Sequence, residues 1–168
     1  RLKLLLSRKG RLVVRFTNRK VVAQLVEFTP KGDKVLVATD SFALRKWGWQ
    51  YSCKNLPAAY LTGFLFGKKV AEKKYKGEVV FDTGFRSPLH KGKYYAFLKG
   101  VLDAGVSVPH SGKDLFPDDK KIQGAHIQDY AGKIKKDGKG QFAQYLKSNA
   151  APENISSAFA QVKQKLAK

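Results

Sequence analysis

Apolar and polar side chains alternate through residues 10–24, which read GRLVVRFTNRKVVAQ. Successive side chains of a strand point to opposite faces, so Leu12, Val14 and Phe16 share one face. The opposite face carries Arg11, Val13, Arg15 and Thr17. The polar residues TNRK between the two apolar runs predict a β-hairpin with an apolar face and a cationic face. Taken alone, the pattern fits an ordinary solvated sheet face equally well.

The next segments predict a third strand and two helices. Residues 29–34 (TPKGDK) predict a turn and residues 35–39 (VLVAT) a β-branched strand, which together extend the hairpin into an antiparallel meander. Asp40 or Ser41 can cap a short helix through FALRKW. A longer helix is expected over 55–77, with Asn55 as its cap and Gly77 as its end.

Residues 78–84 (EVVFDTG) form a short, nearly continuous apolar run, which is typical of a buried strand. A helical crossover leads to this strand, so it is expected to be parallel to its neighbour. Another helix is predicted over 92–105, ended by Gly105. The predicted fold class is α/β, with a mixed sheet of an antiparallel meander plus a parallel strand, in a ribonuclease-H-like topology.

The pattern changes after residue 105. Pro109, Pro117, several glycines and the acidic stretch DLFPDD predict loops, with one short helix around 126–134. The last segment carries one apolar stripe at helical spacing, which must pack on something: Ile155, Phe159, Val162 and Leu166. We therefore expect an α/β core domain over 1–105 and an extended loop and helical region over 106–168.

Charge narrows the class of partner. The 168 residues include 33 Lys and Arg against 13 Asp and Glu, a net charge of +20 with a pI near 10.1. The first 26 residues contain eight basic residues and no acid. Such a chain repels itself unless a polyanion neutralises it, and nucleic acid is the first candidate. No apolar stretch approaches the roughly 18 residues of a transmembrane helix, so a membrane partner is not expected.

The cysteine and methionine counts add two expectations. Cys53 is the single cysteine, which excludes an intramolecular disulfide framework and fits a reducing, intracellular compartment. Methionine is absent altogether, so Arg1 is not expected to be the natural start of the chain.

Catalytic patterns are sparse. His90, His110 and His126 lie far apart and none has metal-ligand spacing to Cys53, so no metal or cofactor is expected. Known phosphate-binding and nucleophile motifs are absent, and with them any small-molecule substrate. The enzymatic alternative is a metal-dependent nuclease that uses Asp40 and Asp82 at strand ends. The simpler interpretation is that Asp40 caps a helix and Asp82 holds a turn, which favours a binding protein over an enzyme.

Aromatic residues next to cations favour RNA. Trp47 and Trp49 follow Arg45 and Lys46, and Tyr94 follows Lys91 and Lys93. RNA-binding surfaces stack bases on such rings, although core packing explains a tryptophan more often. Lysine clusters near 68–76 and 133–139 either bind phosphates or solvate a surface.

Several motifs, in order along the chain, resemble one known family. They are RLVVRFTNRKVVAQ, RKWGW, NLPAAYLTGFLFGKK, FDTG, LKGVLDAGVSVPHS, GAHIQDYA and QFAQYLK. The chain resembles the 5S-rRNA-binding protein family of the large ribosomal subunit, called L-eighteen in bacteria and archaea and L-five in eukaryotes. The segment from VPHS onward and the compact length are similar to the archaeal branch.

The resemblance implies a structural protein of the cytoplasmic ribosome that binds 5S rRNA and anchors it in the central protuberance. Its further partners would be the large-subunit rRNA and neighbouring ribosomal proteins. In this family the basic arm normally begins upstream of the position of Arg1, and a proline usually stands where this chain has Gly10. A sequence-tolerant DNA-binding protein remains the non-enzymatic alternative.

The resemblance and the basic and aromatic pattern together give a set of candidate RNA-binding residues. The hairpin positions carried over from the family come first, and the flanking basic and aromatic residues complete the set: Arg1, Lys3, Arg8, Lys9, Arg11, Arg15, Thr17, Asn18, Arg19, Lys20, Gln24, Arg45, Lys46, Trp47, Trp49, Lys54, Lys68, Lys69, Arg86, Lys91, Lys93 and Tyr94.

Overall fold

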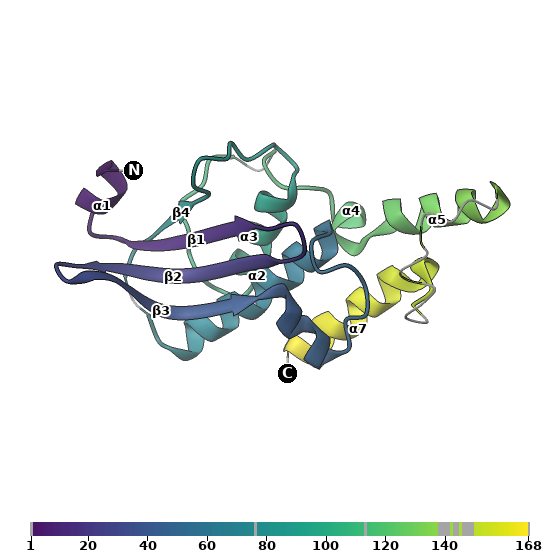
Figure 1. Ribbon diagram of the computed structural model, residues 1–168, viewed down its shortest axis with the longest axis horizontal. Coiled ribbons are helices and arrows are strands. Elements are labelled where there is room, and N and C mark those ends of the chain that lie inside the picture. Colours follow the sequence, from purple (N-terminus) through teal and green to yellow (C-terminus); the bar gives the residue numbers. More distant parts are fainter. Residues whose placement is uncertain are drawn as a thin grey trace.

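The computed structural model describes residues 2–75, 77–112, 114–137, 142, 145 and 150–167 (Figure 1). The strands are β1 (Gly10–Phe16), β2 (Val21–Thr29), β3 (Gly32–Asp40) and β4 (Val79–Asp82). The helices are α1 (Leu2–Leu6), α2 (Leu56–Glu72), α3 (Lys93–Asp103), α4 (Asp119–Gln123), α5 (Ala125–Asp137) and α7 (Ile155–Ala167). Two 3-10 segments, η1 (Ser41–Trp47) and η2 (Pro152–Asn154), complete the described elements.

The four strands form one mixed sheet in the order β3-β2-β1-β4. The β1–β2 and β2–β3 pairs are antiparallel, and the β1–β4 pair is parallel. The chain reaches β4 through α2, as the crossover argument requires. The predicted α/β class with a meander and a parallel strand is therefore confirmed.

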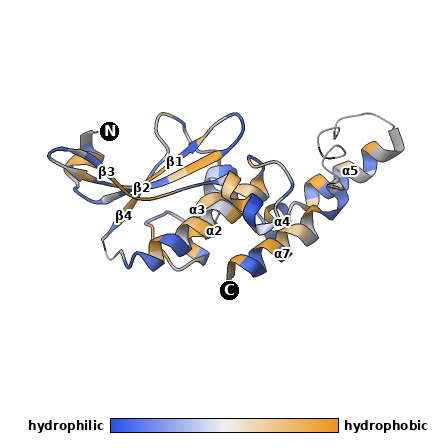
Figure 2. Ribbon diagram, turned by 60° about the horizontal axis from the view of Figure 1, so that its bottom comes forward, coloured by the Kyte–Doolittle hydropathy of each residue, from blue (hydrophilic) through white to orange (hydrophobic). Residues whose placement is uncertain are grey.

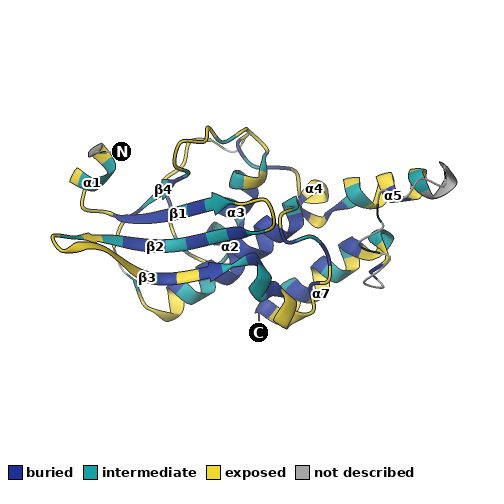
Figure 3. Cartoon of the chain, in the orientation of Figure 1, coloured by how far each residue is buried: buried dark blue, intermediate teal, exposed yellow. Residues whose placement is uncertain are grey.

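Helices α2 and α3 cover one face of the sheet, and Figure 2 separates the two layers. Leu12 and Val14 on β1 are buried at this face, together with Ala23 and Leu25 of β2, with which they pair. Phe16, the third predicted core residue of β1, is partly buried and packs against the core. The opposite face, which we call the open face, carries Arg15 and Val13 and lies toward the viewer in Figure 3.

Helix α2 begins where the sequence predicts and ends earlier. The Asn55 side chain accepts a hydrogen bond from the Ala58 N–H at 2.9 Å, and a proline occupies the first turn. The helix ends at Glu72, five residues before the predicted end at Gly77, because Lys73 caps it and Lys74 adopts a positive φ of 51°. Residues 71–74 are exposed, so no core contact extends the helix.

Two glycines let α2 and α3 approach at backbone distance. A Cβ atom on Gly63 would collide with the Phe97 carbonyl oxygen, and one on Gly100 with the Tyr60 carbonyl oxygen. Any larger side chain at either position would push the helices apart. This close contact fixes α3 and the loop before it relative to the sheet.

The C-terminal helix α7 is part of the same hydrophobic core. All four residues of its predicted stripe are buried, and the Phe159 ring lies 5.5 Å from the Tyr60 ring of α2. The prediction that this stripe packs on protein is confirmed. Val108 and Ile122 also join the core, so the division at residue 105 stays a prediction.

The region before α7 has more helix than the sequence indicates. Helix α5 runs from Ala125 to Asp137, beyond the short helix predicted around 126–134, and α4 precedes it. Across the described part of the chain, every helix is too short or too polar to cross a membrane.

Candidate nucleic-acid interface

The open face of the sheet is less cationic than the hairpin pattern predicts. Arg11 is only 3% exposed, because carboxylates from two other strands surround it. Its Nη2 lies 2.6 Å from Asp33 Oδ1, an ion pair without hydrogen-bond alignment, and its Nη1 lies 3.9 Å from Asp82 Oδ2. Arg11 thus lies on the predicted face but is buried there, which corrects the expectation that it is an accessible RNA-binding residue. Its position instead links the β2–β3 hairpin to β4.

Arg15 is held in a single orientation on the same face. Its Nη1 donates to the carbonyl oxygens of Val14 at 2.8 Å and Asp82 at 2.9 Å, and its Nη2 donates to Asp82 Oδ1 at 3.2 Å. The Asp82 carboxylate also accepts from the Gly84 N–H at 2.8 Å. Asp82 is 6% exposed whereas the Arg15 side chain is 41% exposed. Arg15 is thus paired yet accessible.

The β1–β2 turn presents polar groups at one end of the sheet. Thr17 closes the turn, since its Oγ1 donates to the Lys20 carbonyl oxygen at 2.9 Å and accepts from the Lys20 N–H at 3.0 Å. Asn18 and Arg19 are exposed at the tip, and Lys54 Nζ donates to Asn18 Oδ1 at 3.4 Å. Lys20 is paired with Asp40 at 2.7 Å. Among the described residues, the Arg19 side chain has no ion-pair partner.

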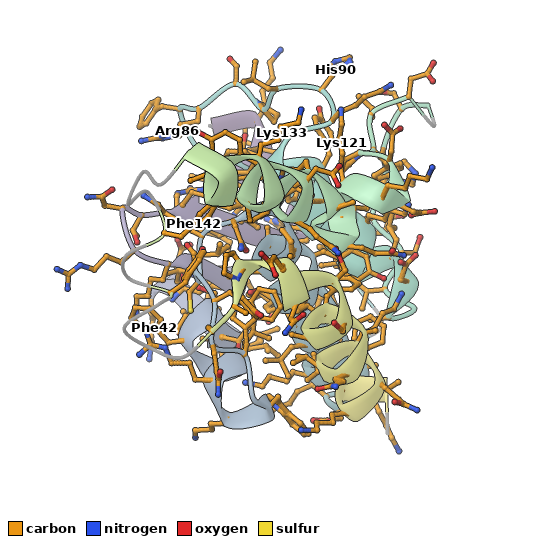
Figure 4. The ribbon with its side chains drawn as sticks, turned by 90° about the vertical axis from the view of Figure 1, so that its right-hand side faces the viewer. Phe42, Arg86, His90, Lys121, Lys133 and Phe142 are labelled. Atoms are coloured by element: carbon orange, nitrogen blue, oxygen red, sulfur yellow. The ribbon has the colours of Figure 1, made fainter. Side chains whose placement is uncertain are left out.

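Segment η1 places further cations beside the turn. The Asp40 side chain caps it by accepting from the Ala43 N–H at 3.3 Å, which confirms the predicted cap. The Arg45 guanidinium lies 4.8 Å and Lys20 Nζ 5.4 Å from the centre of the Phe42 ring. In Figure 4, Phe42 and Arg86 lie on the same side of the molecule, the side of the open face.

The two tryptophans differ. Trp47 is exposed and stays a candidate for stacking. Trp49 is 1% exposed, and its Nε1 donates to the Ser52 carbonyl oxygen at 3.2 Å. The expectation that Trp49 contacts RNA is corrected, because its indole ring is a core side chain.

Lys68 and Lys69 lie apart from the other candidates, on α2 behind the sheet. Lys68 Nζ donates to the Ala167 carbonyl oxygen at 2.6 Å, and Lys69 Nζ donates to Thr39 Oγ1 at 3.1 Å. A cation at the carbonyl end of α7 stabilises that helix. Both lysines thus have structural partners in the chain.

The remaining candidates divide by exposure. Gln24 and Tyr94 are partly buried, and Arg1 lies outside the described residues. Lys9 is exposed and paired with Glu78. The others are exposed: Lys3, Arg8, Lys46, Lys91, Lys93 and Arg86. Phe85, in the loop after β4, is 98% exposed and is not among the residues predicted from the sequence. The sequence feature that could have identified Phe85 as a candidate is its position between the DTG turn and the basic residue Arg86.

The acidic residues of the nuclease alternative do not come together. Asp40 ends β3 and Asp82 ends β4, which are the two opposite edge strands of the sheet. Asp40 is paired with Lys20, and Asp82 with Arg11 and Arg15. Among the described residues, no cluster of three potential metal ligands is found. The geometry needed for two-metal catalysis is not formed here.

Comparison with known proteins identifies the family. Residues 5–80 match the family described as ribosomal large subunit proteins 60S L5 and 50S L18. The large ribosomal subunit protein uL18 of Korarchaeum cryptofilum is 47% identical over 169 positions, which cover 99% of this chain and 85% of that protein. The chain belongs to the uL18 family. The uL18 protein of Methanosphaera stadtmanae is 42% identical over 159 positions, covering 94% of this chain and 81% of that protein.

Membership in the uL18 family confirms the resemblance drawn from the sequence motifs, and the relatives are of the expected archaeal type. The chain is a ribosomal protein of the large subunit, whose place is on the ribosome. The family match runs from within α1 to the first half of β4, and thus includes β1, β2 and β3 of this uL18-family chain in full.

Asp40 gives this uL18-family chain an acid-sensitive contact. Burial acts to raise the pKa of Asp40, but the hydrogen bond and charge of Lys20 and the N–H groups of Ala43 and Phe42 together lower it below 3.8. Because the folded pKa is depressed, this stabilisation is present above the unfolded pKa and is lost as pH falls through the folded value.

Asp40→Asn keeps the cap and removes the ion pair. We expect it to cost less than about 1 kcal/mol of unfolding free energy at neutral pH, since the pair is partly exposed. Below pH 3.8 the wild type and the variant converge. Urea denaturation at several pH values measures this difference. A gap that persists in acid would assign the effect to packing instead.

Proposed function

We propose that this uL18-family chain binds 5S rRNA and anchors it in the central protuberance, with further contacts to the large-subunit rRNA and neighbouring ribosomal proteins. Family membership supports the ribosomal role. The observation that carries the RNA contact is a set of three arginines around β1, which we call the rim arginines: Arg8, Arg19 and Arg86.

The rim arginines flank β1 and its parallel neighbour. Arg8 precedes β1, Arg19 follows it, and Arg86 follows β4. All three are exposed, and within the described residues their side chains have no ion-pair or hydrogen-bond partner. Four other cations of this region are already paired with carboxylates: Arg11 with Asp33, Arg15 with Asp82, Lys20 with Asp40 and Lys9 with Glu78. Unpaired guanidinium groups are suited to phosphates, which accept two parallel hydrogen bonds.

Binding of purified protein to 5S rRNA tests this function. Filter binding should show tight binding to 5S rRNA, and weaker binding to duplex DNA of equal length. The logarithm of affinity should fall with the logarithm of salt by about 0.7–0.9 per phosphate contacted. Equal affinity for the DNA would favour the sequence-tolerant DNA-binding alternative. Magnesium-dependent cleavage of the RNA would favour the nuclease.

A further inference from the structure

A pocket of about 430 Å³ opens beside Arg15, between the end of β1 and the loop after β4. Its volume lies in the range of about 300–1,000 Å³ that small-molecule sites occupy. Residues from four parts of the fold line it, among them Arg15, Phe16, Asp82, Phe85, Arg86 and Tyr94. The proposed RNA contact does not use this pocket, apart from Arg86 at its rim.

The Arg15 guanidinium keeps one edge free. It has five N–H groups: two on Nη1 serve the Val14 and Asp82 carbonyl oxygens, and one on Nη2 serves Asp82 Oδ1. Asp82 thus occupies the end of the fork between the two Nη atoms. In the described part of the chain, the Nε–H and the second Nη2–H are left without acceptors, and they lie along one edge.

The plane of this guanidinium is fixed as well. A Cβ atom on Gly84 would lie 3.0 Å from Arg15 Cζ and 3.2 Å from Nε, so the Gly84 backbone packs directly against the group. Gly84 has a φ of +73°, a conformation that favours glycine. The free edge of Arg15 is therefore preorganised before any ligand arrives.

The pocket also holds a buried hydroxyl without a partner. The Tyr94 ring packs edge-on against Phe16, with ring centres 4.7 Å apart. Its hydroxyl is buried and makes no hydrogen bond within the described residues. An unsatisfied buried hydroxyl is costly, and ligand binding is one way to satisfy it. At the pocket, Phe85 exposes almost its whole ring.

We propose that this pocket takes one unstacked guanine base of the bound RNA. The Nε and Nη2 groups of Arg15 donate to O6 and N7 of guanine, the pairing that a guanidinium edge forms with this base. Tyr94 supplies its hydroxyl, and Phe85 stacks on the base, as aromatic rings do with splayed-out RNA bases. The proposal rests on the proposed function and names what this part of the interface reads.

Charge favours a base over a phosphate here. Asp82 already neutralises Arg15, and its buried carboxylate would repel a phosphate placed against the same guanidinium. A neutral base accepts the same two hydrogen bonds without that repulsion. Aromatic rings at Phe16, Tyr94 and Phe85 offer apolar surface that suits a base plane.

The main test compares two proteins on two RNAs. The proteins are wild type and Arg15→Lys, which keeps the charge and removes the two-donor edge. The RNAs are 5S rRNA and the same transcript with 7-deazaguanosine for guanosine, which lacks the N7 acceptor. We expect wild type to bind the modified RNA about 5- to 150-fold more weakly. Arg15→Lys should already bind 5S rRNA at the weakened level, and the modified RNA should lower its affinity further only through effects of the base on the RNA fold.

Effects of the modified base on the RNA fold are the same for both proteins and cancel in this comparison. An equal loss in wild type and Arg15→Lys would overturn the pocket proposal. A wild type that binds neither RNA would instead overturn the proposed function. The salt dependence should be alike for the two proteins, because the lysine keeps the charge. A phosphate in place of the base would give wild type and Arg15→Lys the same relative loss on the modified RNA, since removal of N7 changes no phosphate.

A second variant covers the case in which Arg15→Lys unfolds. Tyr94→Phe removes only the hydroxyl, and Tyr95→Phe makes the same change one residue along α3, at a side chain outside the pocket lining. We expect Tyr94→Phe to bind 5S rRNA several-fold more weakly than wild type, with a thermal midpoint of the free protein at or above that of wild type, because an unsatisfied hydroxyl is removed. Tyr95→Phe should bind like wild type. Equal affinities for the two variants would overturn the role of Tyr94.

Discussion

Replacing the three rim arginines by glutamate will weaken 5S rRNA binding by at least about a thousandfold while leaving the thermal midpoint unchanged. Each lost charge-assisted contact costs about 1.5–3 kcal/mol, so three together cost at least about 4.5 kcal/mol. The stability of the fold should change little, because these side chains are exposed and have no ion-pair or hydrogen-bond partner among the described residues. Filter binding measures the affinity and circular dichroism the midpoint.

The salt dependence of this triple variant adds a second measure. Loss of three phosphate contacts should reduce the slope of log affinity against log salt by about 2–3. The matched control reverses three exposed lysines outside the candidate clusters, which changes net charge equally: Lys120, Lys121 and Lys165. If the control weakens binding as much, total charge rather than the surface around β1 carries the affinity.

Asp82→Ala will destabilise the fold by about 3–5 kcal/mol, the usual cost of removing one partner of a buried ion pair. Arg11 is almost fully buried, and without Asp82 its one remaining carboxylate partner among the described residues is Asp33. Arg15 loses its side-chain acceptor and Gly84 its hydrogen bond. Asp82→Asn should cost less, because its amide oxygen can still accept the Gly84 N–H. Urea denaturation measures both variants.

A double variant identifies the cause of this loss. If the uncompensated Arg11 charge is responsible, Arg11→Met in the Asp82→Ala background should recover part of the lost stability, since an apolar chain of similar length tolerates burial. Simple addition of the two single losses would mean that the two residues act independently.

Arg15 and Lys20 are poor targets for charge reversal, because glutamate at either position would lie beside an aspartate.

The sequence predicts those parts of this fold that local patterns determine. The alternation at Leu12 and Val14, the Asn55 cap and the α7 stripe each depend on neighbours within a few residues, and each is found as expected. The parallel pairing of β4 with β1 was also predictable, because a strand reached through a helical crossover is usually parallel to its neighbour.

What the sequence does not show are partners that meet only in the folded chain. Arg11 has the same hairpin pattern as Arg15, yet Asp33 and Asp82 bury it from two other strands. Trp49 stands next to basic residues in sequence, but its ring belongs to the core. The pocket joins Arg15 with Phe85 and Tyr94, residues far apart along the chain. Neither hydrophobic periodicity nor the distribution of charge along the sequence predicts which of these distant residues will be in contact.

The parallel β1–β4 pair has a consequence for synthesis on the ribosome. The β1–β2 hairpin consists of neighbouring residues and can form early, whereas β4 arrives only after α2 has been made. Arg11 can pair with Asp33 as soon as β3 has formed, but until β4 arrives Arg15 lacks Asp82 and remains an uncompensated guanidinium group. Docking of β4 neutralises Arg15 and fixes its orientation. We therefore expect a chain without β4 to bind polyanions with little selectivity. Addition of this last strand should make the binding of RNA selective.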